Sequence, residues 1–222
     1  SLERRGAGVA KGRDASIQAM VHPHATPTHA TPHARATVAG ARHEPVPYAS
    51  KLPLRDPASI DLVVVHCTET PTLASAREFG ERVIYPDSGT GACGHFYIDR
   101  DGALVCYVEP ERIANHVRGW NPRSIGVEIV NTGRYPHWYD SRHQAMDEPY
   151  AEAQIDALVA LIAGLRGRLP SLRYIAGHED LDTARVEASD DPTQTVWRKR
   201  DPGPQFPWDR VLAICGLARL KP

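Results

Sequence analysis

The feature that most constrains the fold is a run of apolar, mostly β-branched residues near residue 60. Ile60 to His66 reads IDLVVVH, and its apolar residues do not alternate with polar ones. Such a run is typical of a strand that is covered on both faces, as in a sheet between layers of helices. The polar segment Cys67 to Pro71 follows directly and predicts the end of the strand.

Other segments predict further strands and the helices between them. Residues 95–100 and 103–108 flank Asp101-Gly102, a pair that favours a two-residue hairpin. Strand-like runs also cover 124–130 and 172–176, and helices are expected at 73–85, 150–168 and 208–217. Strands that alternate with helices, together with one hairpin, predict a single α/β domain with a central mixed β-sheet flanked by helices.

The N-terminal 50 residues differ in composition from the rest. They carry six Lys/Arg against three Asp/Glu, a single aromatic residue and a repetitive His-Pro-Ala-Thr stretch. Such a segment cannot bury enough apolar surface to offset its ordering entropy. We therefore expect a flexible arm at 1–50 and a folded domain at 51–222. The arm contains five histidines: His22, His24, His29, His33 and His43. They could bind a metal weakly, or the arm could be a low-complexity spacer.

Composition excludes several classes of function. The formal net charge is −1, so there is no large basic field to attract nucleic acid. No apolar run approaches the roughly 20 residues that span a bilayer, and no signal peptide is visible. The four cysteines lack C-x-x-C spacing, which argues against a zinc knuckle but leaves a single disulfide open.

Two histidines have the same context, because each follows an apolar strand and begins a polar loop. His66 lies in VVVHCTET and His178 in YIAGHEDLD. The ends of strands that lead into loops are where α/β sheets place their sites. Either histidine could therefore bind a metal, or could be a hydrogen-bonded residue of the core.

Two carboxylates are candidates of the same kind. Asp201 lies in KRDPGP, where two prolines stiffen a loop that could hold it against a metal or could be a surface turn. In SIGVEIV, alternation places Glu128 on the same strand face as Gly126, which would leave room for a ligand. The alternative is a solvated glutamate on an open sheet face.

Taken together, the motifs resemble a family. VVVHCTET, GHFYIDRDG, ANHVRG, SIGVEIVN, AGHEDLD and KRDPGPQFPW occur in the order found in zinc-dependent N-acetylmuramoyl-L-alanine amidases of the type-2 branch. The resemblance covers roughly residues 58–215. It implies hydrolysis of the amide between the lactyl group of N-acetylmuramic acid and L-alanine, in peptidoglycan or its muropeptide fragments.

The resemblance also implies roles for individual residues. One Zn²⁺ per chain would be held by His66, His178 and Asp201, which leaves a fourth position open. Glu128 would be the general base, and Lys199 would stabilise the oxyanion. The residues that would contact substrate are His95, Asn115, His116 and Asn131.

The chain departs from the family pattern at several points. Many relatives carry Tyr before the histidine of GHFYIDRDG, where this chain has Gly94, and phage members use Cys where it has Asp201. Residues 134–149 and 183–197 look like insertions. A non-catalytic peptidoglycan-binding module of the same fold is the alternative function. The cell envelope is expected in preference to the cytoplasm, and the oligomeric state is left open.

Overall fold

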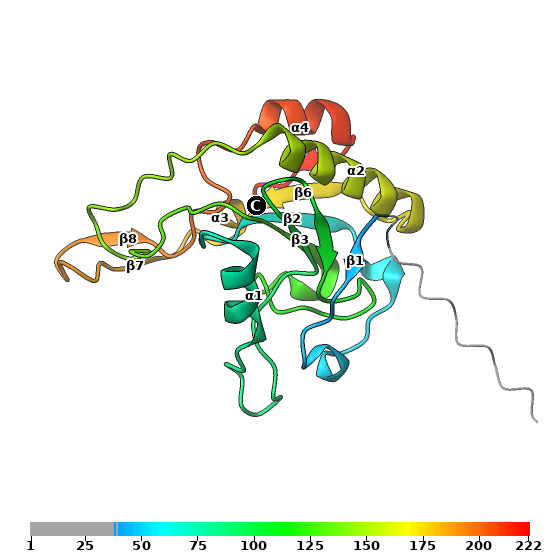
Figure 1. The fold of residues 1–222 in the computed structure, drawn as a ribbon, viewed down its shortest axis with the longest axis horizontal. Coiled ribbons are helices and arrows are strands. Elements are labelled where there is room, and N and C mark those ends of the chain that lie inside the picture. The colour runs from blue at the N-terminus through cyan, green and yellow to red at the C-terminus, as the bar shows by residue number, and fades with distance from the viewer. Residues whose placement is uncertain (1–37, 39) are drawn as a thin grey trace, which may run out of the picture. The chain divides into compact units, whose positions relative to one another are not determined.

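The folded part of the protein is built on one mixed sheet of seven strands. A computed structural model describes residue 38 and residues 40–222 (Figure 1). The strand order across the sheet is β1-β4-β3-β5-β2-β6-β9. The strands are β1 Arg42–His43, β2 Leu62–Cys67, β3 Phe96–Ile98, β4 Leu104–Cys106, β5 Ser124–Ile129, β6 Tyr174–Gly177 and β9 Ala218–Arg219. The predicted fold class is confirmed.

Strand β2 lies inside the sheet, as its sequence predicts. All six of its residues are buried, and it pairs in parallel with β5 on one side and β6 on the other. The predicted hairpin is also present, since β3 and β4 are antiparallel, but the connection between them runs from Asp99 to Ala103 and is longer than the two residues predicted. Gly102 lies in this connection with a φ of +85°, which favours glycine.

Helices cover both faces of the sheet. The helices are α1 Leu73–Glu81, α2 Glu152–Arg168, the short α3 His178–Leu181 and α4 Trp208–Cys215. α2 and α4 lie together on one side of the sheet and α1 lies on the other (Figure 1). Apolar residues of α2 and α4 share one core with Val63 and Val65 of β2. Because side chains alternate along a strand, Leu62, Val64 and His66 face the other way.

Three predicted helix boundaries differ from the observed ones. α2 begins at Glu152 rather than at residue 150, and the side chain of Gln154 accepts a hydrogen bond from the Ala151 N–H to close its first turn. α1 ends at Glu81 rather than at residue 85, because Arg82 is extended. α4 ends at Cys215 because Gly216 takes the left-handed conformation, which terminates helices.

The domain begins earlier than residue 50, which corrects the predicted boundary. β1 pairs in parallel with β4, and Val46 and Tyr48 are buried in a core with Tyr97 and Tyr107. Two buried apolar side chains and a strand pairing therefore hold this segment on the domain. The rest of the predicted arm, residues 1–37 and 39, lies outside the described residues, as do four of its five histidines.

The segment 183–197, predicted as an insertion, folds into a small antiparallel hairpin of β7 Arg185–Glu187 and β8 Thr195–Trp197. It contacts the other predicted insertion, since the N–H of Ser189 donates to the carbonyl of Tyr139. All four cysteines are free and buried. Among the described residues, no helix is long and apolar enough to cross a membrane.

Candidate active site

The register of the central strands places the first two candidate residues side by side. His66 of β2 pairs with Glu128 of β5, and Glu128 also pairs with Tyr97 of β3. Paired residues of neighbouring strands project from the same face of a sheet. His66, Glu128 and Tyr97 therefore all lie on the face opposite α2, close to the carboxyl ends of parallel strands.

The other two candidate ligands come from segments that meet at the next strand. β6 ends at Gly177, and His178 begins α3 directly afterwards. The loop that carries Asp201 is held against this helix, because the N–H of Glu179 donates to the carbonyl of Asp201 at 2.9 Å. A Cβ on Gly177 would come within 2.8 Å of Cδ of Pro202, so glycine is required for this approach.

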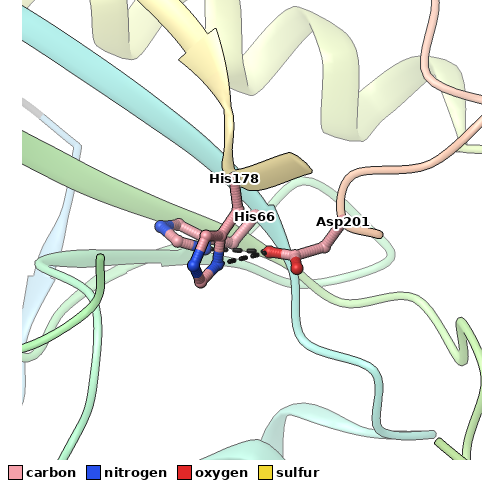
Figure 2. A group of neighbouring side chains, drawn as sticks. All are labelled: His66, His178 and Asp201. Carbon is pink, nitrogen blue, oxygen red and sulfur yellow. Dashed lines mark hydrogen bonds and ion pairs between the residues drawn. The ribbon is translucent and has the colours of Figure 1, made fainter. Parts of the chain in front are cut away.

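The three predicted ligands converge on one point. Figure 2 shows both imidazoles directed at the carboxylate of Asp201. Oδ2 of Asp201 lies 2.9 Å from Nδ1 of His66 and 3.2 Å from Nδ1 of His178. The three side chains are buried, and their ligand atoms all lie within 4.8 Å of one another.

The charge states at this point suit a cation. Burial lowers the pKa of His66 to about 4, against the opposing effect of its hydrogen bond to Asp201, so its imidazole is neutral at pH 7. Burial raises the pKa of Asp201, but the neighbouring His178 and hydrogen bonds from both histidines bring it well below its usual 3.8. The site thus offers a neutral imidazole and a carboxylate, as metal binding requires.

A buried atom of Asp201 provides a test of fit. Oδ1 of Asp201 is buried and has no hydrogen-bond partner among the described residues. A buried carboxylate oxygen without a partner is costly unless a ligand satisfies it. Two histidines and one carboxylate form a donor set used by catalytic zinc, so the residues present fit Zn²⁺.

Glu128 lies beside the three ligands without belonging to them. Its Oε1 is 4.0 Å from Nδ1 of His66. Burial, reinforced by the negative charge of Asp201, raises the pKa of Glu128 well above its usual 4.5, while the positive charge of Lys199 opposes the rise. A carboxyl group with a raised pKa is suited to accept and return a proton near neutral pH.

A cavity of about 380 Å³ opens over these residues and is lined by all five predicted zinc and catalytic positions. Of the four residues predicted to contact substrate, Asn115 and His116 line it. His95 does not, because it is fully buried and bonded to the carbonyl of Arg112 and the N–H of Gly126. Asn131 is also buried, and its amide donates to the carbonyl of Glu148. The structure therefore corrects the predicted contact with substrate for His95 and Asn131.

The space beside Gly126 is also not what the sequence predicted. A Cβ on Gly126 would come within 2.6 Å of the ring of His116, so the imidazole of His116 fills the room expected for a ligand. Gly94 has a similar neighbour, because a Cβ there would lie 2.9 Å from Cγ of Glu128. Any side chain at residue 94 would therefore press on Glu128.

Several residues of the cavity wall were not predicted. Glu69 and Arg134 form a buried ion pair, with Nε to Oε1 at 2.7 Å and Nη2 to Oε2 at 2.9 Å. Aromatic side chains add to the wall: Phe79, Trp138 and Tyr139. Trp138 and Tyr139 come from 134–149, so the aromatic residues of that segment are the sequence feature that could have predicted this part of the wall.

Comparison with known sequences identifies the family to which the chain is similar. A family model described as N-acetylmuramoyl-L-alanine amidase (Amidase_2) matches residues 56–204. The chain is 32% identical over 126 residues to the 1,6-anhydro-N-acetylmuramyl-L-alanine amidase AmpD of Enterobacter cloacae, covering 53% of this chain and 54% of AmpD. It is 27% identical over 122 residues to the endolysin of Escherichia phage T7, covering 54% of this chain and 76% of the endolysin. The match thus spans about half the length of AmpD.

Solved structures share the fold. A crystal structure of a selenomethionine derivative of AmpD superimposes with a TM-score of 0.57 at 25% identity, over 79% of this chain and 94% of that one. The amidase AmiD from E. coli, in complex with anhydro-N-acetylmuramic acid-L-Ala-D-γ-Glu-L-Lys, gives a TM-score of 0.53 at 21% identity, over 72% of this chain and 58% of AmiD.

Proposed function

The chain belongs to the N-acetylmuramoyl-L-alanine amidase family, and from this we propose that it hydrolyses the amide between the lactyl group of N-acetylmuramic acid and L-alanine, using one Zn²⁺. The observation that carries the proposal is the convergence of His66, His178 and Asp201 beside Glu128 in one cavity. The substrate would be peptidoglycan or its muropeptide fragments.

The residues of the chain have distinct tasks in this reaction. Zinc, when bound by the two histidines and Asp201, supplies a Lewis acid that polarises a carbonyl and lowers the pKa of water. Glu128 is placed to take a proton from the attacking water and to return it to the leaving amine of L-alanine. Its raised pKa fits both steps, because the same group must be a base first and an acid afterwards.

Lys199 would stabilise the negative charge that develops on the carbonyl oxygen. It lines the cavity two residues before Asp201, in a loop that includes Pro202 and Pro204. It lines the same cavity as His66 and Glu128, which supports a role close to the reacting groups. A cation directed at a developing oxyanion lowers the barrier more than it strengthens ground-state binding.

The alternative function, a non-catalytic module that only binds peptidoglycan, does not require a general base. Such a module would be expected to lack a zinc ligand or an acid/base residue. Here the three ligands, Glu128 and Lys199 all line one cavity, which supports the enzyme. We also propose that the protein acts in the cell envelope, where peptidoglycan lies; cell fractionation with an antibody against the protein tests this.

Digestion of purified muropeptides, analysed by mass spectrometry, tests the function. We expect the free stem peptide and the free muramic acid glycan as products, loss of both after chelation, and recovery when zinc is added back. His178→Ala is the matched control for a protein that lacks one ligand. Full activity in a metal-free preparation, or cleavage at a different bond, would contradict the proposal.

A further inference from the structure

His116 contacts a proposed zinc ligand directly. Nδ1 of His116 lies 3.0 Å from Nε2 of His66, the ring nitrogen on the side away from Asp201. Nε2 of His116 lies 3.2 Å from Oγ of Ser124, and that hydroxyl donates to the carbonyl of Trp120 at 2.8 Å. A chain of hydrogen bonds therefore runs from His66 into the backbone.

The hydrogen bonds from His66 to Trp120 can all be donated in the same direction. A metal ligand must present a bare nitrogen, so His66 with Nδ1 toward the metal carries its proton on Nε2. That N–H needs an acceptor, and Nδ1 of His116 is the atom in place. His116 then carries its own proton on Nε2 and donates it to Ser124, whose hydroxyl hydrogen is already directed at Trp120. Each group in the chain donates once.

The fold holds His116 in this position from two further sides. Its ring fills the space over Gly126, where a Cβ would come within 2.6 Å. Its backbone is fixed because Oδ1 of Asn121 accepts hydrogen bonds from the N–H groups of His116 and Val117, at 3.0 and 2.7 Å. Gly126 on the sheet leaves space for the imidazole of His116, and the side chain of Asn121 holds its backbone.

We propose that His116 is a positioning residue for the metal: it accepts the Nε2–H of His66, fixes the tautomer and the ring plane of that ligand, and passes the hydrogen bond on to Ser124. This inference rests on the proposed function for the zinc site itself, and it assigns to His116 a role other than substrate contact. Partners of this kind usually contribute about 10- to 100-fold to metal affinity.

Zinc affinity of the full chain, measured by competition with a fluorescent chelator, tests the proposal. We expect His116→Phe, which keeps a flat ring but removes the acceptor, to bind zinc about 10- to 100-fold more weakly than wild type. His116→Gln retains an acceptor oxygen and should recover part of the loss. His143→Phe makes the same change at an exposed histidine outside the cavity, so it is the matched control and should leave zinc affinity unchanged.

Nuclear magnetic resonance of the zinc-loaded wild type gives a readout that needs no variant. Nitrogen-15 spectra of the ring nitrogens should show His66 and His116 both protonated at Nε2. A proton on Nδ1 of His116 would overturn the proposal even if every variant failed to fold.

The possible outcomes separate this inference from the proposed function. Histidines elsewhere in the chain can also bind zinc, so binding by His178→Ala is subtracted as the background. If wild type and His178→Ala bind zinc equally, the proposed zinc site is wrong. If wild type binds specifically and His116→Phe binds as tightly but with a raised KM for muropeptide, His116 is a substrate contact and the inference is wrong.

Discussion

Glu128 is the residue whose role can be tested most cleanly, because it touches the site without being a ligand. Glu128→Gln should bind zinc normally but lose about 10²–10⁴-fold in kcat, the usual contribution of general acid–base catalysis. Steady-state kinetics on a defined muramoyl peptide, together with a zinc assay, checks this. Loss of zinc in the variant, or wild-type turnover, would show that the assigned role is wrong.

The same substitution has an expected effect on stability. Burial raises the pKa of Glu128, so folding favours its protonated form, and the stability it contributes at low pH is lost as pH rises through the raised pKa. Glu128→Gln cannot ionise. In the metal-free protein it should therefore be more stable than wild type at pH 7, and the difference should shrink near pH 4 in thermal unfolding scans. An equal difference at both pH values would contradict the raised pKa.

Lys199 gives a second test at the scale of single residues. Lys199→Ala should lower kcat by about 10²–10³-fold with little change in KM, because the lost interaction is strongest in the transition state. Lys199→Arg should rescue only partly, since a planar guanidinium does not replace a compact ammonium. A tenfold rise in KM at constant kcat would instead make Lys199 a substrate-binding residue.

At the scale of elements, one buried ion pair joins three segments around the cavity. Arg134 binds Glu69 in the loop after β2, and its Nη1 donates to the carbonyl of Trp197 at the end of β8. The indole N–H of Trp138 donates to the carbonyl of Glu69. Glu69 has a φ of +48°, a strained conformation for this residue that the surrounding bonds maintain.

Removal of Arg134 should therefore destabilise the three segments that it joins around the cavity. We expect Arg134→Met to lower the free energy of unfolding by about 3–5 kcal/mol, because it leaves the Glu69 carboxylate buried without its partner. The control is Arg142→Met in the same segment, where the arginine that pairs with Asp140 is exposed, so its removal should lower the free energy of unfolding much less. Equal losses in chemical denaturation would show that the buried pair has no special role.

The elements that could be predicted are those whose own residues specify them. β2 and α2 carry enough apolar residues to be recognised alone, whereas β1 and β9 have two residues each and exist only because β4 and β6 offer an edge. The β7–β8 hairpin lies in a stretch that looked like an insertion, and its strands are stabilised by pairing with each other and by contacts with residues 139–141. Local sequence carries no information on such pairings.

At the scale of the whole molecule, the site follows from the topology. The parallel strands β5, β2 and β6 have their carboxyl ends side by side, so residues far apart in sequence meet there. The motifs that carry His66, Glu128 and His178 predicted this meeting. The motifs could not separate residues that line the cavity from those beneath it. His95 and Asn131 belong to the same motifs as the site, but hydrogen bonds to the backbone hold them out of the cavity.

The central claim is that a catalytic zinc binds between His66, His178 and Asp201, at the carboxyl ends of the central strands. The most direct measurement is an anomalous difference map, recorded at the zinc absorption edge from crystals of the full chain grown with zinc. The account predicts one strong peak in contact with Nδ1 of both histidines and with the carboxylate of Asp201, at the usual zinc–ligand distances of about 2.0–2.2 Å. A map without a peak there, with zinc bound elsewhere on the protein, would contradict it.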